Sequence, residues 1–547
     1  MGLRTYPFLI VLTSVIDYKG HLPDQSSDLY SLCNNCDLRS NPEKFLKLPR
    51  ECAMASQFSD RRPSVIIIGT GFGGLCMAIQ LKNAGFDRFT LLEKALDVGG
   101  TWRDNTYPGA ACDVQSHFYS FSFEPKHDWS RKFGLQPEIH DYMRACVDKY
   151  GLRDHIRFNQ EVRTAVFNES SNEWRVETGS GDVHHAAILV TATGQLNQPA
   201  WPNIPGLDTF QGALFHSARW DHSYPLEGKK VAVIGTGASA IQFVPEIVPK
   251  VKSLSLFQRS AAWVLPKPDR PFRKWEQTLF LKLPVWDRIY RALIYWKNES
   301  RALAFTRFNS LLNIFAWQAK RFARSEVRNP LKRRDLIPAY QIGCKRILIS
   351  NDWYKAVDKD HVDLVTTGIE RVVSDGVVTT DGTLHKADAL ILGTGFAASE
   401  FLSPMTIAGR GGRTLADAWQ NGAEAYKGIT VSGFPNFFML YGPNTNLAHN
   451  SIVFMLESQV NYVMSCIRKL GAQPGVAMEV KPERLEEFAS QIQERLAHSV
   501  WESGCDSWYL DKNGKNTINW PGFTFTYRRE TLSVDPEDFI FLKPAPR

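Results

Sequence analysis

The sequence has no hydrophobic run long enough to cross a membrane. Its longest apolar stretch near a terminus spans residues 7–12, extended loosely to residue 16, whereas a transmembrane helix needs about 20 residues. Arg4 ahead of this stretch is typical of a signal peptide, but no small-residue cleavage site follows it cleanly. We expect residues 1–60, which are polar and without periodicity, to form a flexible N-terminal extension of a cytoplasmic protein, with a removed signal peptide as the alternative.

The sequence also lacks the cysteine patterns of metal sites and redox pairs. Nine Cys in 547 residues are too few for a disulfide scaffold. Cys33 and Cys36 form a single Cys-x-x-Cys without the second pair that a four-ligand zinc site needs. No Cys-x-x-x-x-Cys lies beside the first glycine-rich turn, which argues against disulfide reductases, because these enzymes need a redox-active pair. We therefore expect no metal.

Charge of neither sign is in large excess. The chain has 64 Lys and Arg against 57 Asp and Glu, a net charge of +7, which is too weakly basic to indicate a nucleic-acid partner. The excess is concentrated in residues 273–334, which contain 15 basic and 4 acidic residues. Large side chains recur there at helical spacing, and the segment is predicted to be a helical insertion. These side chains are Trp275, Leu279, Leu283, Trp286, Tyr290 and Leu293.

Two arrangements of this insertion are open. We favour a helical hairpin whose apolar stripe packs over a substrate cleft, with its Lys and Arg in solvent, because Trp and Tyr at helical spacing are more often buried. The alternative is a basic amphipathic helix on an anionic membrane surface. In either arrangement we expect membrane contact to be at most peripheral.

One pattern of strand, glycine turn, helix and strand occurs twice. Residues 64–68, which are β-branched from Val65 to Ile68, lead into the turn 69–74, and a second strand at 89–92 ends at Glu93. Residues 231–234 lead in the same way into the turn 235–240, and a strand at 254–257 precedes Arg259. This order is typical of dinucleotide-binding folds. The predicted fold class is α/β, with two doubly wound Rossmann-like domains and the helical insertion.

Each glycine of the first turn has its own expected task. Gly69 permits the tight turn, Gly71 lets a pyrophosphate approach the backbone, and Gly74 lets helix and strand pack closely. The pyrophosphate is then expected at the helix N-terminus, where free N–H groups favour anions.

The two patterns differ in charge at the end of the second strand. Glu93 lies 24 residues after Gly69, and Arg259 lies 24 residues after Gly235. A carboxylate suits the ribose hydroxyls of FAD or NAD, whereas a guanidinium suits the 2′-phosphate of NADP. The pair indicates a flavin together with NADPH, although charge alone does not separate FAD from NAD in the first site. The alternative for Arg259 is a solvated charge at a strand end.

Just before the second turn, the sequence resembles the fingerprint of type I Baeyer–Villiger monooxygenases, within the flavin-containing monooxygenase superfamily. The match is Phe210-x-Gly212-x-x-x-His216-x-x-x-Trp220-Asp221, and many members have Pro at its last position. The resemblance covers about residues 62–529 and is strongest to a branch found in fungal secondary metabolism and in actinobacterial ketone monooxygenases. Other similar segments are 99–102, 107–109, 112–113, 192–194, 343–346, 393–395 and 507–509.

The resemblance implies a reaction and its catalytic residues. NADPH reduces FAD, the reduced flavin takes up O₂, and a C4a-peroxyflavin attacks a ketone carbonyl to give an ester or lactone. Arg346 is then the fixed cation that stabilises the developing negative charge, and Asp113 orients it. The alternatives are a phosphate or surface contact for Arg346 and a turn or cap carboxylate for Asp113. We expect His216 and Trp220 to couple domain rotation to catalysis and not to act as acid or base.

The resemblance and the glycine turns together predict the cofactor sites and the domains. The predicted FAD residues are Gly69, Gly71, Phe72, Gly74, Glu93, Gly100, Thr101, Trp102, Asp104, Asp113, Tyr119 and Val162, and the predicted NADP residues are Ala111, Gly235, Thr236, Gly237, Ala238, Ser239, Ala240, Gln242, Arg259, Ser260 and Lys345. Residues 61–198 and 388–530 are predicted to form the FAD domain, residues 199–387 the NADP domain, and residues 531–547 a C-terminal tail.

Two other functions remain open from the sequence. One is an N- or S-oxygenating flavin monooxygenase, and the other is a non-catalytic nucleotide-binding redox sensor. The sequence indicates neither which ketone is the substrate nor the oligomeric state.

Overall fold

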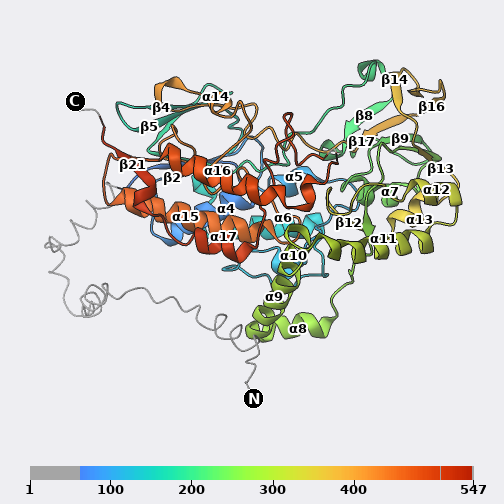
Figure 1. Cartoon of the computed structure of the whole chain (residues 1–547), viewed down its shortest axis with the longest axis horizontal. Coiled ribbons are helices and arrows are strands. Elements are labelled where there is room, and N and C mark those ends of the chain that lie inside the picture. Colours follow the sequence, from blue (N-terminus) through green and yellow to red (C-terminus); the bar gives the residue numbers. More distant parts are fainter. Residues whose placement is uncertain (1–61, 506, 545–547) are drawn as a thin grey trace, which may run out of the picture. The chain divides into compact units, whose positions relative to one another are not determined.

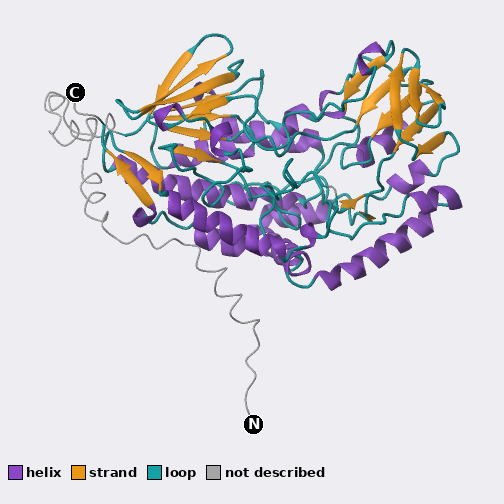
Figure 2. Cartoon of the chain, turned by 45° about the horizontal axis from the view of Figure 1, so that its top comes forward, coloured by secondary structure: helices purple, strands orange, loops and turns teal. Residues whose placement is uncertain are grey.

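Two parallel β-sheets organise the part of the chain that the computed structural model describes, residues 62–505 and 507–544 (Figure 1). The strands gather in two separate groups (Figure 2). The predicted N-terminal extension and the Cys33–Cys36 pair lie outside the described residues. No helix within 62–505 or 507–544 is long and apolar enough to span a membrane.

The first glycine turn belongs to a five-stranded parallel sheet. Its strand order is β19 (Phe437–Met439), β7 (Ile188–Thr191), β1 (Val65–Ile68), β2 (Phe89–Leu92) and β3 (Ile156–Arg157). Every residue of the central strand β1 is buried, as expected of a parallel strand covered on both faces. A mixed sheet of β18 (Thr406–Ala408), β4 (Val162–Asn168), β5 (Glu173–Thr178) and β6 (Val183–Ala186) packs on one face.

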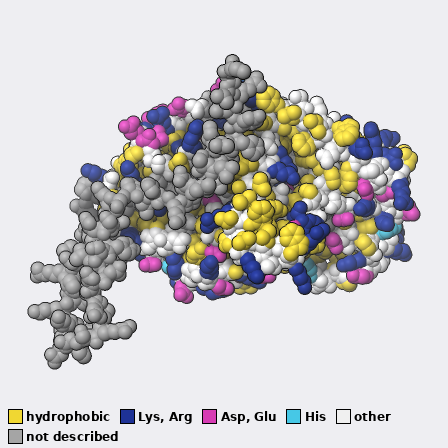
Figure 3. All heavy atoms as spheres, turned by 90° about the horizontal axis from the view of Figure 1, so that it is seen from below, with side chains coloured by type: hydrophobic (Ala, Val, Ile, Leu, Met, Phe, Trp, Pro, Cys, Tyr) yellow, Lys and Arg dark blue, Asp and Glu magenta, His cyan; other side chains and the backbone are white. Residues whose placement is uncertain are grey.

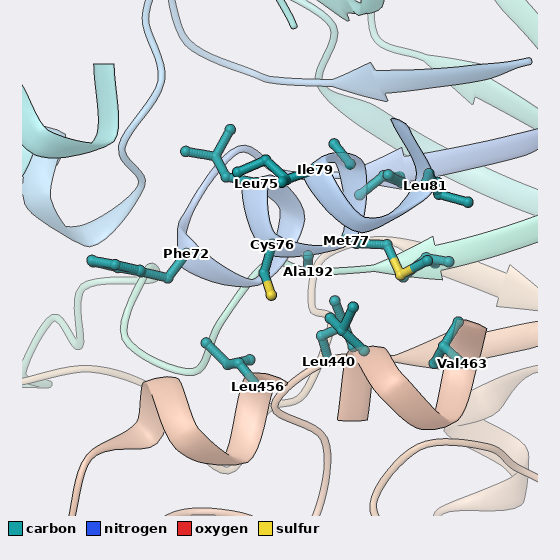
Figure 4. Packing of buried hydrophobic residues seen from close by; sticks show 14 of the residues in the cluster. Phe72, Leu75, Cys76, Met77, Ile79, Leu81, Ala192, Leu440, Leu456 and Val463 are labelled. Carbon is teal, nitrogen blue, oxygen red and sulfur yellow. The ribbon is translucent and has the colours of Figure 1, made fainter. Parts of the chain in front are cut away.

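Helices cover the other face of the first sheet. They are α4 (Phe72–Asn83), α6 (Gln136–Lys149) and α15 (Ile452–Gly471). Nine residues of α4 are buried, because the helix lies between the sheet and α15. Figure 4 shows Cys76 and Met77 of α4 pointing toward Leu440 and Leu456. This packing fixes the helix whose N-terminus follows the first glycine turn.

The second glycine turn belongs to another five-stranded parallel sheet. Its order is β13 (Val362–Val365), β10 (Ser253–Phe257), β9 (Lys230–Ile234), β17 (Ala389–Leu392) and β8 (Ala213–His216). The helices α7 (Ala240–Ile247) and α13 (Trp353–Val357) share its core. The predicted border at residue 388 is too early, because β17 pairs with both β9 and β8 of this sheet. A meander of β14 (Ile369–Val373), β15 (Gly376–Thr379) and β16 (Leu384–Lys386) lies between β13 and β17 in sequence.

Two antiparallel chain segments connect the first half of the described chain, which contains the first sheet, with the second half, which contains the second sheet. Residues 198–200 and 394–397 run side by side, joined by a bridge between Pro199 and Phe396. The Ala200 N–H donates to the Gly395 carbonyl (2.9 Å), and the Thr394 hydroxyl donates to the Ala200 carbonyl (2.6 Å). The second of these segments includes Thr394 and Gly395 of the segment 393–395 that the sequence singled out.

The predicted insertion is helical, but most of its stripe faces solvent instead of a cleft. It comprises α8 (Lys274–Lys282), α9 (Pro284–Glu299), α10 (Ala302–Thr306), α11 (Leu312–Glu326) and α12 (Pro330–Asp335). Trp275, Leu283, Trp286 and Leu293 are 44–63% exposed. The prediction that this stripe packs over a cleft is wrong for these four residues, which face solvent, whereas Tyr290 of the same stripe packs against Phe272 and Phe280.

The end of the chain is also more ordered than a tail. Strand β21 (Phe539–Leu542) pairs antiparallel with β20 (Ala477–Val480), and the Tyr426 hydroxyl donates to Asp538 (2.7 Å). Residues 531–544 therefore pack against the first half, close to α16 (Pro482–Ala497) and α17 (Thr524–Glu530).

Candidate active site

One cavity of about 1090 Å³ adjoins both glycine turns. Its walls include the carboxyl ends of β1, β2, β9 and β10, both connecting segments, and the residues around Arg346. Open α/β sheets bind ligands at the carboxyl ends of their strands. The cavity is therefore where two dinucleotides could meet.

The first glycine turn has the shape that a pyrophosphate needs. Gly69 has a φ of +102°, and a Cβ there would lie 2.8 Å from the Ala192 carbonyl oxygen. A Cβ on Gly74 would lie 1.9 Å from the Gly69 carbonyl oxygen, whereas one on Gly71 would meet nothing within 4 Å. Only Gly71 faces open space in the cavity, so the backbone there is accessible to a ligand.

The second turn repeats this geometry. Gly235 has a φ of +108°, and a Cβ there would lie 2.4 Å from the Gly393 carbonyl oxygen. A Cβ on Gly237 would meet nothing within 4 Å, and Gly237 also lines the cavity. Both turns therefore fit a dinucleotide phosphate by the same criterion.

The Glu93 carboxylate at the end of β2 accepts four hydrogen bonds from the protein. One oxygen accepts from the main-chain N–H (3.0 Å) and the hydroxyl (2.6 Å) of Thr70. The other accepts from the main-chain N–H of Ala95 (3.0 Å) and the guanidinium of Arg103 (2.9 Å). Glu93 is buried but lines the cavity. The residue predicted to meet ribose hydroxyls thus also ties the turn to helix α5 (Thr101–Asp104).

Basic side chains meet at the end of β10 in the second sheet. Arg259 is exposed and lines the cavity with Ser260 and Lys345. The Lys345 ammonium donates to the Ser260 hydroxyl (3.3 Å) although 85 residues separate them. Three of the predicted NADP residues therefore lie together, with positive charge where Glu93 stands in the first sheet.

Arg346 and Asp113, which are 233 residues apart, form an ion pair in the cavity wall. The guanidinium Nη2 and Nε donate to one Asp113 oxygen at 2.6 and 3.1 Å. Burial raises the pKa of Asp113, but the charge and hydrogen bonds of Arg346, with Lys267 further away, lower it overall. The charge of Asp113 in turn raises the pKa of Arg346. About a third of each side chain is exposed, 32% and 33%, so a fixed cation faces the cavity.

Phenols beside this ion pair stay neutral. Burial raises the pKa of Tyr509 to about 12, against the opposing effect of Arg346, and burial likewise raises the pKa of Tyr441. The Tyr441 hydroxyl donates to Asn446 (2.6 Å), whose amide donates to Asn519 (2.9 Å). Asn446 lines the cavity. No motif indicated it, although asparagines at 444, 446 and 450 lie close together in the sequence.

A disulfide between Cys344 and Cys505 joins two segments of the cavity wall. Cys344 precedes Lys345 and Arg346, and Cys505 lies shortly before Trp508, which also lines the cavity. The sequence did not indicate this pair, because 161 residues separate the two cysteines. The bond runs against the expected cytoplasmic location, since thiols are kept reduced there.

The predicted cofactor residues line the cavity, with two exceptions. Gly74 and Ala240 lie behind the turns and are absent from the wall. Gln242 lines the cavity, yet its amide oxygen accepts from the Tyr107 hydroxyl (2.9 Å), and its amide nitrogen donates to the Ala111 carbonyl (3.0 Å). Gln242 therefore connects α7 of the second half to the first half.

Comparison with known proteins identifies the family. Residues 66–273 match the family described as pyridine nucleotide-disulphide oxidoreductase, a range that includes both glycine turns. A protein of Streptomyces coelicolor named Baeyer-Villiger monooxygenase is 46% identical over 484 residues, 88% of this chain and 93% of that protein. The chain belongs to the Baeyer–Villiger monooxygenase family.

Solved structures of related monooxygenases share the fold. An oxidized steroid monooxygenase bound to NADP matches with a TM-score of 0.79 and 31% identity, over 88% of this chain and 99% of that one. A complex named OTEMO with FAD and NADP matches with a TM-score of 0.80 and 26% identity, over the same shares. The predicted α/β fold with two Rossmann-like domains is confirmed.

The fingerprint of the Baeyer–Villiger family lies outside the cavity wall. Burial lowers the pKa of His216 to about 4, against the effect of the backbone at Gly395. The centroid of its ring lies 6.3 Å from that of Trp201, which follows the first connecting segment, and 6.0 Å from that of Phe396 in the second. Trp220 contacts Phe243 of α7 at 5.2 Å. Asp221 accepts hydrogen bonds from residue 223, while Phe210 and Gly212 pack beside the edge of the second sheet.

Proposed function

We propose that this monooxygenase uses FAD and NADPH to insert one oxygen atom of O₂ beside a ketone carbonyl, giving an ester or lactone. The observation that supports this most is the Arg346–Asp113 ion pair in the wall of a cavity that both glycine turns share. Bound FAD would accept hydride from NADPH and activate O₂, as the cofactor's own chemistry allows.

The side chains of this protein would position the cofactors and stabilise charge. The open backbone at Gly71 and Gly237 would hold the pyrophosphates of FAD and NADP. Arg259 and Lys345 would bind the 2′-phosphate, which favours NADPH over NADH. The Arg346 guanidinium would stabilise the negative charge that develops on oxygen when the carbonyl is attacked. Asp113 would keep that guanidinium aimed into the cavity.

The proposal extends to partners and location. The proposed substrates are a small-molecule ketone and O₂, with no nucleic-acid partner. The protein is proposed to contact membranes at most peripherally.

Flavin spectra and product analysis test this function. NADPH should bleach the flavin of the holoenzyme without air, and air should restore it. A panel of linear, cyclic, aromatic and polycyclic ketones should then give an ester or lactone with at least one member. Arg346→Ala should still bind flavin, and NADPH should still bleach that flavin, but the variant should form no ester or lactone. The matched control is Arg334→Ala, whose side chain is 73% exposed on α12.

Each other function predicts a different result. A heteroatom oxygenase would convert a sulfide or amine and no ketone. A redox sensor would show no product and no reoxidation cycle. Ester formation by Arg346→Ala at the wild-type rate would remove Arg346 from the proposed chemistry.

A further inference from the structure

Exposed hydrophobic side chains are concentrated on the helical insertion. Of the 22 large hydrophobic side chains that are exposed among residues 62–505 and 507–544, 13 lie within residues 273–334. We call the following twelve, each 42–65% exposed, the insertion face: Trp275, Leu281, Leu283, Val285, Trp286, Ile289, Leu293, Trp296, Phe308, Leu311, Ile314 and Trp317. Patches of this kind mark interaction sites on soluble domains.

Helix α9 presents an apolar side to solvent, and the side that faces the protein is mixed, with Asp287 and Glu299 buried together with Ile294. Val285, Ile289, Leu293 and Trp296 are spaced by four, four and three residues and share one exposed side. On an ordinary surface helix, such a side faces the core. The orientation of α9 therefore leaves an apolar surface that the described residues do not cover.

Buried polar contacts hold α9 in this orientation. Glu299 accepts from the Asn450 amide (2.6 Å) and from the Thr524 main chain (2.5 Å) and hydroxyl (2.8 Å). The Arg291 guanidinium donates to the carbonyls of His117 (2.6 Å) and Ser120 (3.1 Å). Because these groups would lose their partners if the helix rotated, the outward direction of the apolar side is fixed by the fold.

The charge around the insertion face is positive. The exposed basic side chains of the same helices and their connections are Lys274, Lys282, Arg288, Lys297, Arg307, Lys320, Arg321 and Arg324. Two of the four acidic residues of the insertion, Asp287 and Glu299, are buried. Glu276 is bound to Arg270 (2.6 Å), and Glu326 lies 3.8 Å from Lys355. Helices α8 and α9 lie at the lower edge in Figure 1, and the view from that side shows hydrophobic side chains beside Lys and Arg (Figure 3).

We propose that the insertion face binds the surface of an anionic lipid bilayer. Its Trp, Leu and Ile side chains enter the interfacial layer, and its Lys and Arg meet the headgroup phosphates. Trp is enriched at that depth in membrane proteins. A protein partner fits less well, because protein interfaces are depleted in Lys. A second copy fits less well still, since two strongly basic faces would repel.

Sedimentation with vesicles tests the proposal on the full-length holoenzyme. Phosphatidylcholine vesicles with and without phosphatidylserine are compared at 0.1 and 1 M salt, where the Debye length is ~10 and ~3 Å. We expect binding to the anionic vesicles, and each basic side chain at the surface contributes about fivefold to the partition coefficient. Binding should fall at least tenfold in 1 M salt. This result does not depend on whether the enzyme converts a ketone.

Matched variants separate the apolar and basic parts of the insertion face. Trp286→Ser with Leu293→Ser should weaken binding at least tenfold, whereas Leu96→Ser, 79% exposed in the first half, should not. Lys282→Glu with Arg288→Glu should also weaken binding at least tenfold, whereas Lys250→Glu with Lys252→Glu, exposed in the second half, should leave most of it. All of these side chains are exposed, so unchanged thermal unfolding is expected and checks that each variant is folded.

Three results would overturn the proposal. The first is no pelleting of the wild type with phosphatidylserine vesicles at 0.1 M salt. The second is equal binding by the wild type and the variants of the insertion face. The third is a wild type that does not bind vesicles but forms a concentration-dependent dimer in analytical ultracentrifugation. In that case Trp286→Ser with Leu293→Ser would abolish the dimer.

Discussion

Two glycines two residues apart in the second turn should respond differently to the same substitution. In Gly237→Ala, the added methyl group enters open cavity space, and no positive φ is required. The free energy of unfolding should change by no more than about 0.5 kcal/mol. The methyl group would keep a phosphate away from the backbone and cost about one charge-assisted hydrogen bond, about 1.5–3 kcal/mol. The apparent constant for NADPH should therefore rise roughly ten- to a hundredfold.

Gly235→Ala is the matched comparison. Its methyl group would lie 2.4 Å from the Gly393 carbonyl oxygen, at a φ of +108°. The overlap costs about 1–3 kcal/mol, and the left-handed backbone about 1–2 kcal/mol more. Thermal unfolding and the NADPH dependence of flavin reduction are measured on both variants. Normal NADPH use by Gly237→Ala, or an unchanged unfolding midpoint for Gly235→Ala, would refute the assignment of the turn.

Three further changes have defined outcomes. Arg259→Ala should raise the apparent constant for NADPH roughly ten- to a hundredfold and leave NADH use nearly unchanged in steady-state assays; equal losses with both would exclude the 2′-phosphate contact. Because burial lowers the pKa of His216 to about 4, the stability it contributes is present above pH 6.5 and is lost as pH falls toward 4. The loss is about 2 kcal/mol between pH 7 and 5, and urea unfolding of His216→Gln should lack it. Cys505→Ser should lower the free energy of unfolding by about 2–4 kcal/mol. A reductant should have the same effect on the wild type and no effect on the variant.

Local patterns predicted the glycine turns well. A β-branched strand followed by closely spaced glycines has few alternatives, because the turn, the close approach and the helix packing each exclude a side chain. The structure shows this directly, since a Cβ would clash at Gly69 and Gly74 but not at Gly71. The charge contrast between Glu93 and Arg259 also lies in the sequence itself. The distances from these two residues to other groups cannot be read from the sequence.

Long-range arrangement was beyond the sequence. Helical periodicity gives α9 two faces but does not say which one meets the protein; buried partners of Glu299, such as Thr524, decide that. The membership of β17 in the second sheet depends on its pairing with β8. In this pairing Ala389 lies opposite Ala213, which is 176 residues earlier in the chain. The Cys344–Cys505 bond likewise depends on the fold alone. Only the family resemblance suggested that Arg346 and Asp113 would meet.

The fate of labelled oxygen tests the proposed function most directly. The holoenzyme is supplied with NADPH, a ketone from the panel and ¹⁸O₂, and the products are analysed by mass spectrometry. We predict one molecule of ester or lactone for each NADPH consumed, and each product molecule should contain one ¹⁸O atom. Arg346→Ala should give no such product. NADPH consumption that gives only hydrogen peroxide with every ketone, or labelled oxygen only in a sulfoxide or amine oxide, would contradict it.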